Sequence, residues 1–132
     1  MRWTEQARLL LAKAEQDAVV VRLATRDTEI ADEIVGFHVQ QAAEKCMKAV
    51  LCSTGVAYRR THDLQELHDA LVDSGSVPLP EVTELVAWSP FATLYRYAEW
   101  SELEPVDRSH ASRLVEAAMR WAKALLSTDD AQ

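Results

Sequence analysis

The sequence has few residues that interrupt regular structure, with 3 glycines and 4 prolines among 132 residues. An all-β architecture of many short strands needs frequent turn residues, so that class is disfavoured. The sequence also has no run of about 18 apolar residues, so we expect no transmembrane helix. Charged residues break up the apolar N-terminal stretch, which argues against a secretory signal. A single domain of long helices is the fold class that remains.

Basic side chains are also scarce. The chain has 14 Lys and Arg residues against 21 Asp and Glu residues, which gives a net charge of −7. Proteins that bind a nucleic-acid backbone over a broad surface are normally basic, so only a local basic pocket fits this composition. The two cysteines, Cys46 and Cys52, lie in one predicted helix, about 9 Å apart along its axis and too far for a disulfide. No Cys and His spacing suggests zinc. We therefore expect free thiols in a protein of the reducing cytoplasm. We also expect no bound metal, no cofactor and no contact with a membrane.

Hydrophobic periodicity predicts an all-α, up-and-down bundle of four to five helices. Thr4 and Thr28 are candidate N-caps of the first two helices, and Thr61 or Asp63 of the third. Gly55 stands where the second helix should end. The first two predicted helices span residues 4–25 and 28–53, and the third begins at about residue 64. A fourth spans 81–88, with a further turn or two at 91–97, and the last spans 107–126. These form one domain over 1–126, followed by a polar tail at 127–132.

One face of the second predicted helix carries a polar stripe. His38, Gln41 and Lys45 follow one another at i, i+3 and i+7 and therefore share that face. An imidazole, an amide and an ammonium in line form a donor-rich surface that suits a phosphate or a base edge. Hydrogen bonds to neighbouring helices or to a second subunit are the alternative interpretation.

Acidic and basic residues are concentrated in different parts of the sequence. Between Asp63 and Asp107 there are ten acidic residues and one basic residue, Arg96. Arg96 either pairs with carboxylates of the chain or binds an anionic ligand, and Tyr97 beside it either stacks on a base or completes the core. Basic residues gather instead near the end of the second helix, where cations stabilise a helix C-terminus or form a patch for a nucleotide phosphate or an acidic partner. That patch consists of Lys45, Lys48, Arg59 and Arg60.

The run FHVQQAAEKCMKAVL at 37–51, followed by THDL at 61–64 and by Arg96-Tyr97, resembles the HEPN family (higher eukaryotes and prokaryotes nucleotide-binding domain). The pattern is that of its commonest bacterial branch, although Ala98 replaces the usual proline. The resemblance spans roughly residues 1–126 and implies a helical bundle that is usually a homodimer. It also implies a minimal nucleotidyltransferase as partner, in a toxin–antitoxin-like pair. The ligand-binding residues that we predict from the shared face and the family run are His38, Gln41, Lys45, His62, Arg96 and Tyr97.

Some HEPN proteins are metal-independent RNases that carry an Arg and a His with four to six residues between them; the His acts as acid or base and the Arg stabilises the phosphorane charge. None of the four histidines here has an Arg at that spacing before it. We therefore predict a nucleotide-binding protein or nucleotidyltransferase partner without catalytic residues. Two alternatives stay open: an RNase toxin that combines Arg96 with His38 or His62, and a non-enzymatic interaction scaffold. His62 itself either orders the loop before the third helix or contacts a ligand.

Overall fold

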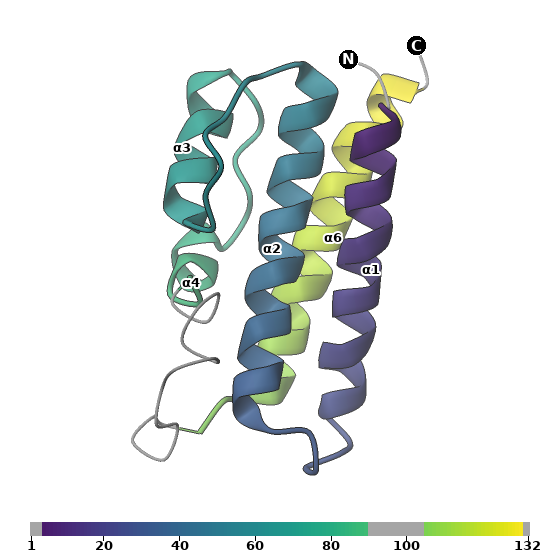
Figure 1. Cartoon of the computed structure of the whole chain (residues 1–132), viewed down its shortest axis with the longest axis vertical. Helices are drawn as coiled ribbons and strands as arrows, with labels where there is room; N and C mark the ends of the chain where they lie inside the picture. Colours follow the sequence, from purple (N-terminus) through teal and green to yellow (C-terminus); the bar gives the residue numbers. More distant parts are fainter. Residues whose placement is uncertain (1–3, 90–104, 131–132) are drawn as a thin grey trace.

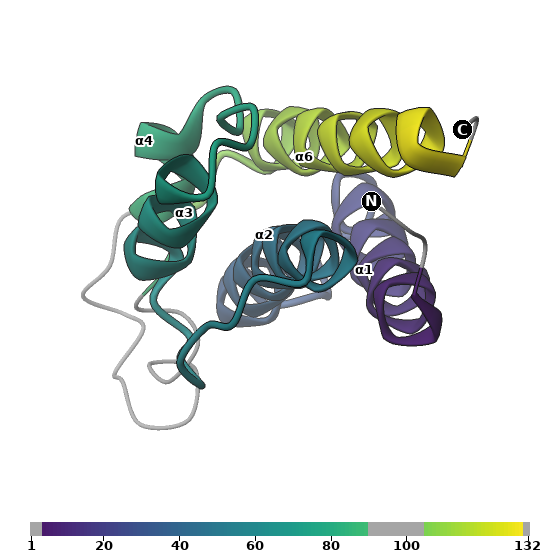
Figure 2. The ribbon, with the colours of Figure 1, turned by 90° about the horizontal axis from the view of Figure 1, so that it is seen from above.

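The computed structural model describes residues 4–89 and 105–130, and side chains up to residue 127. Within these ranges it contains five helices and no strand, which confirms the all-α expectation. Helices α1 (Glu5–Ala24), α2 (Asp32–Thr54) and α6 (Arg108–Asp130) run side by side along the long axis, α3 (Leu64–Asp73) lies beside α2, and the short α4 (Val82–Val86) contacts α3 (Figure 1). Seen from above, α1 lies on the side of α2 away from α3 (Figure 2).

Three of the predicted helix ends are confirmed by their hydrogen bonds. The Thr4 hydroxyl accepts the N–H of Ala7 at 2.9 Å and caps α1. The Asp63 carboxylate caps α3 by accepting two N–H groups of its first turn. Gly55 ends α2 with φ at 73°, a left-handed conformation that a residue with a Cβ rarely adopts.

The start of α2 differs from its prediction. Thr28 is not its N-cap, since α2 begins only at Asp32 and Ala31 occupies the N-cap without a side-chain hydrogen bond. Residues 27–31 form a turn instead, because Arg108 of α6 binds main-chain oxygens there. Its guanidinium donates to the carbonyls of Ala24 and Asp27, both at 3.0 Å, and to that of Ile30 at 2.6 Å. It also forms an ion pair with Asp32 at 2.8 Å.

Other boundaries were misjudged by a few residues. The fourth helix is shorter than 81–88, and α6 continues past 126 to Asp130, so the first part of the predicted tail is helical. The Asp107 carboxylate accepts the N–H of His110 at 3.0 Å and caps the start of α6. The predicted turns at 91–97 lie outside the described residues. Within the described ranges, no helix has the length and apolarity needed to cross a membrane.

Small residues line the interface between α1 and α2. Ala14 and Ala18 of α1 and Ala42 of α2 are at most 4% exposed, so the two helices approach closely over several turns. Leucines of α3 and α6 fill the other side of α2, which is buried along most of its length. Cys46 lies inside this core, where burial raises the pKa of its thiol to about 12. Both cysteines are free, as predicted.

A buried histidine fixes the segment between α3 and α4. His68 of α3 is 7% exposed, and its Nε2 accepts the N–H of Leu79 at 3.2 Å. Because an N–H group can only donate, this nitrogen carries no proton. Burial lowers the pKa of His68 from the ordinary value of 6.5, and nearby Asp69 opposes this shift.

We expect His68 to make stability depend on pH. Since the pKa is lowered on folding, the unfolded chain takes up the proton first, so the contribution of His68 is complete above about pH 7 and is lost as the pH falls through its folded pKa. Its loss should cost about 1 kcal/mol, the usual contribution of one buried hydrogen bond. Urea unfolding at pH 7 and pH 5 measures this. The variant His68→Gln supplies a non-titrating acceptor and should lose less stability between the two pH values; an equal loss would contradict the assignment.

Candidate functional site

The polar residues of α2 surround two buried carboxylates. The first, Asp17 of α1, has a side chain that is 7% exposed, and both of its oxygens are engaged. His38 Nδ1 lies 2.7 Å from Asp17 Oδ1, and Lys45 Nζ lies 2.6 Å from Asp17 Oδ2. We call Asp17, His38 and Lys45 the Asp17 cluster. It joins α1 to α2 and compensates the buried charge of Asp17.

The second buried carboxylate is Glu44 of α2, whose side chain is 5% exposed. Lys48 Nζ binds Glu44 Oε2 at 3.0 Å, while His62 Nδ1 lies 2.8 Å from Glu44 Oε1. Gln40 Nε2 donates to Glu44 Oε1 at 2.9 Å and to the main-chain oxygen of His62 at 3.0 Å. Glu44, Gln40, Lys48 and His62 form the Glu44 cluster. It fixes the loop before α3 to the middle of α2.

Glu44 also determines how the His62 ring is presented. An ionised carboxylate can only accept hydrogen bonds, so His62 Nδ1 donates to it, and in the neutral ring Nε2 is then an acceptor. The His62 side chain is 64% exposed although its partner is buried. The ring is therefore held from inside the protein and faces solvent with its other nitrogen.

A pocket of about 350 Å³ lies beside this ring, lined by Lys48, Arg60, Thr61 and His62. Among the residues that the structure describes, Arg60 forms no hydrogen bond or ion pair. Its neighbour Arg59 instead binds Glu66 with two nitrogens, at 2.7 and 2.6 Å. The pocket thus collects cationic donors in a protein whose net charge is −7.

Comparison with known families agrees with this fold of long helices. A family model described as the HEPN domain matches residues 2–128, nearly the whole chain. The chain belongs to the HEPN family. No match is found among curated proteins or among solved structures. In this HEPN protein, the run at 37–45 supplies Glu44 itself and its partner Gln40, together with His38 and Lys45, which bind Asp17.

The structure describes four of the six predicted ligand residues. His38 and Lys45 face Asp17, whereas His62 lines the pocket. Gln41 lies between the two clusters and donates to Gln40 Oε1 at 2.7 Å. Arg96 and Tyr97 lie outside the described residues. The four described ligand candidates therefore do not meet in one pocket: the stripe of His38, Gln41 and Lys45 does not line it, whereas His62 does.

Sequence reasoning did not assign roles to the two central carboxylates. Asp17 falls among the buried residues Ala14, Ala18 and Val21 of α1, and an acidic side chain on a buried face indicates a paired charge. Glu44 lies four residues from Gln40 and four from Lys48, at the spacing of helix neighbours. Arg60 and Lys48 had been recognised as part of the basic patch, but not their proximity to His62.

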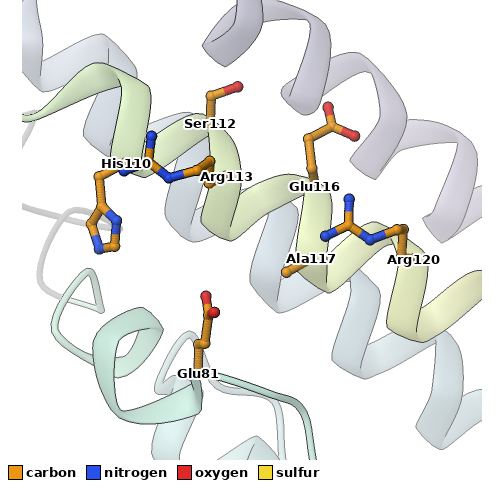
Figure 3. Close-up of a pocket in the computed structure, with 7 residues that line it drawn as sticks. All are labelled: Glu81, His110, Ser112, Arg113, Glu116, Ala117 and Arg120. Atoms are coloured by element: carbon orange, nitrogen blue, oxygen red, sulfur yellow. The ribbon is translucent and has the colours of Figure 1, made fainter.

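A second pocket of about 380 Å³ lies between α6 and the segment that precedes α4 (Figure 3). Glu81 lines one side of this pocket. The other side is formed by residues of α6, namely His110, Ser112, Arg113, Glu116, Ala117 and Arg120. His110 Nε2 lies 3.1 Å from Glu84. Because its charges are of both signs, this pocket suits a lone anion less well than the pocket beside His62.

Proposed function

We propose that this HEPN protein binds a nucleotide, with a phosphate group in the pocket formed by Lys48, Arg60, Thr61 and His62, and acts as the non-catalytic partner of a minimal nucleotidyltransferase. The observation that carries the proposal is the placement of Arg60, which has no partner among the described residues, beside a histidine held by a buried glutamate. Arginine binds phosphate oxygens through two parallel hydrogen bonds.

The other lining residues complete the pocket. Lys48 extends from α2 with a side chain that is 16% exposed, and Glu44 fixes its ammonium at the pocket wall. The Thr61 oxygen accepts the N–H of Asp63 at 3.0 Å, and its hydroxyl donates to the Glu66 carboxylate, so Thr61 orders the loop at the edge of the pocket. Three residues of the pocket are consecutive, so one loop positions them, and Gln40 holds that loop through the His62 carbonyl.

The partner half of the proposal rests on the family resemblance and on charge. Outside the pocket the protein is acidic, which disfavours broad contact with RNA and is compatible with a protein partner. We expect a nucleotidyltransferase encoded beside this protein to copurify with it on coexpression. An interaction scaffold without a nucleotide site would bind that partner and no nucleotide.

RNA cleavage is a second candidate, favoured by one observation. The Glu44 carboxylate directs an acceptor nitrogen of His62 to solvent beside Arg60, which is what a general base and a charge-stabilising cation require. Incubation of the purified protein with total RNA in EDTA tests it. RNA that stays intact at high protein concentration eliminates this candidate.

We expect Arg60→Ala to raise the dissociation constant for ATP or GTP at least about tenfold, since a hydrogen bond to a charged group contributes about 1.5–3 kcal/mol. Isothermal titration calorimetry of the full chain measures it. Arg59→Ala is the matched control, because Arg59 is adjacent and exposed but engaged by Glu66. Both variants should unfold at the wild-type temperature, as surface substitutions do.

Two outcomes would overturn the nucleotide half of the proposal. One is the absence of binding heat with ATP, GTP and short RNA. The other is an equal loss of affinity in Arg59→Ala and Arg60→Ala, which would indicate a diffuse charge effect rather than a defined pocket.

A further inference from the structure

The pocket lined by Lys48, Arg60, Thr61 and His62 carries a small surplus of positive charge. The Lys48 ammonium binds Glu44 at 3.0 Å, so a carboxylate already balances it. Arg60 has no hydrogen bond or ion pair among the described residues. With a neutral His62 ring, Arg60 therefore supplies the uncompensated charge of the pocket. Arg60 alone balances an anion with a single negative charge, but not an anion with two.

His62 is placed to add a second positive charge. Its Nδ1 lies 2.8 Å from Glu44 Oε1, and the Glu44 side chain is 5% exposed, whereas that of His62 is 64% exposed. The ring already donates to the carboxylate through Nδ1, so a proton taken up from solvent goes to Nε2, the nitrogen on the open side. Histidine is the side chain whose charge changes most readily near neutral pH. The second cation is therefore available when a ligand favours it.

The other charged groups around this loop are engaged elsewhere. Besides the buried glutamate and its lysine partner on α2, they are Arg59, Asp63 and Glu66. Arg59 and Glu66 bind each other at 2.6 Å. The Asp63 carboxylate faces the first turn of α3, where it accepts two N–H groups. Among the described residues, Arg60 and His62 are thus the groups that can respond to an anion in the pocket.

The charge of a phosphate depends on the number of its links. An internal diester carries one negative charge, whereas a terminal phosphate loses a second proton with a pKa of about 6 and carries close to two charges at neutral pH. We propose that the pocket selects a terminal phosphate over an internal diester, and that a proton from solvent is taken up on binding and shared between His62 Nε2 and a phosphate oxygen. The second charge of the ligand favours the charged imidazole, which then balances that charge beside Arg60.

This inference rests on the proposed nucleotide pocket and defines the chemical class that the pocket accepts. A terminal phosphate occurs on a mononucleotide and at the end of an RNA strand, and the two present the same oxygens and the same charge. The interior of an RNA strand offers diesters alone. The selection therefore separates a mononucleotide or a strand end from the body of an RNA.

Matched ligands test the selection by NMR titration of the full chain. AMP and cyclic AMP share a base and a ribose, but the phosphate is terminal in AMP and a diester in cyclic AMP. At pH 7 AMP should bind at least about tenfold more tightly, the factor that one hydrogen bond between charged groups contributes. A short RNA with a phosphate at its end, compared with the same RNA ending in a hydroxyl, shows whether strand ends are accepted as well. An RNA without an end phosphate that binds as tightly as AMP overturns the selection.

Proton uptake is measured in the wild-type chain, so it requires no variant. Calorimetric titration with AMP at about pH 7.5, in two buffers of different ionisation enthalpy, should show uptake approaching one proton for each AMP bound. Because the complex holds more protons than the free protein and free ligand, its affinity should fall as the pH rises, by up to about tenfold for each pH unit. Cyclic AMP should show a smaller uptake and a weaker dependence on pH.

Two histidine variants form a matched pair. His62→Gln cannot take up the proton, so AMP and cyclic AMP should bind it with dissociation constants within about threefold of each other. His110→Gln is the control, because His110 also faces a carboxylate, Glu84 at 3.1 Å, but lines the second pocket. It should keep the selection and the proton uptake of the wild type. Circular dichroism checks that both variants are folded.

The outcomes separate this inference from the proposed pocket. Equal affinities for AMP and cyclic AMP that both fall in Arg60→Ala would leave the nucleotide pocket in place and overturn the selection. AMP binding without proton uptake, or selection that survives in His62→Gln, would overturn it as well. Tighter binding of cyclic AMP would do the same and would favour the RNA-cleavage candidate. Absence of binding, or binding that Arg60→Ala leaves intact, overturns the pocket itself and this inference with it.

Discussion

Asp17→Ala is expected to lower the free energy of unfolding by about 3 kcal/mol. Asp17 is a buried acceptor for both His38 and Lys45, at 2.7 and 2.6 Å, so its removal leaves two donors without their partner. Breaking a buried ion pair from one side typically costs about 3–5 kcal/mol. We expect the lower end of this range because the Lys45 side chain is 20% exposed and can reach water. Urea unfolding followed by circular dichroism measures the difference.

A double-mutant cycle separates the ion pair from the loss of packing. With Lys45→Met as the second change, Asp17 and Lys45 should show a coupling energy of about 1–3 kcal/mol, as directly contacting charges do. Asp73→Ala is a control in which an exposed carboxylate is removed, and it should change stability by less than about 0.5 kcal/mol. Additive effects of Asp17→Ala and Lys45→Met would show that the Asp17 cluster is not a coupled unit.

The second large effect concerns Arg108. Arg108→Ala should lower the free energy of unfolding by about 2–3 kcal/mol, because three main-chain carbonyls and Asp32 lose their donor. The loss should appear first as local opening of the turn between α1 and α2, since the guanidinium connects that turn to the start of α6. Urea unfolding gives the total, and amide hydrogen exchange at residues 27–32 locates it.

Two substitutions serve as controls for Arg108. Lys at position 108 keeps the charge but lacks the planar fork, so it should recover only part of the stability. Arg113→Ala removes an exposed arginine from the same helix, one that has no ion pair among the described residues, and should have little effect. Equal losses in Arg108→Ala and Arg113→Ala would disprove the specific role of these hydrogen bonds.

Local sequence signals predicted those parts of the fold that depend on local interactions. The cap at Thr4, the cap at Asp63 and the left-handed stop at Gly55 need only a few neighbouring residues, and all three are confirmed. The start of α2 was wrong because it depends on Arg108, which is distant in sequence. The local signal at this position is Asp27, whose carboxylate accepts the N–H of Glu29 at 2.9 Å and favours a turn here over a helix start at Thr28.

The candidate site shows the same difference between features that depend on local sequence and features that depend on distant residues. Helical spacing correctly placed His38 and Lys45 close together, but it could not show that one carboxylate of α1 binds both. The basic patch pointed to Lys48 and Arg60, whereas their proximity to His62 depends on how Glu44 and Gln40 position the loop. Ligand binding by the six predicted residues stays a prediction, with Arg96 and Tyr97 outside the described residues.

Glu44 sets how strongly the pocket can retain what it binds. Its carboxylate already shares its two oxygens between Lys48 and His62, so an arriving phosphate competes with a resident acceptor. Only Arg60 brings a cation to the pocket that no described carboxylate neutralises. If this pocket binds a nucleotide as proposed, we expect the ligand to exchange readily, so that the occupied fraction follows the cellular concentration of nucleotide instead of one molecule staying bound for the lifetime of the protein.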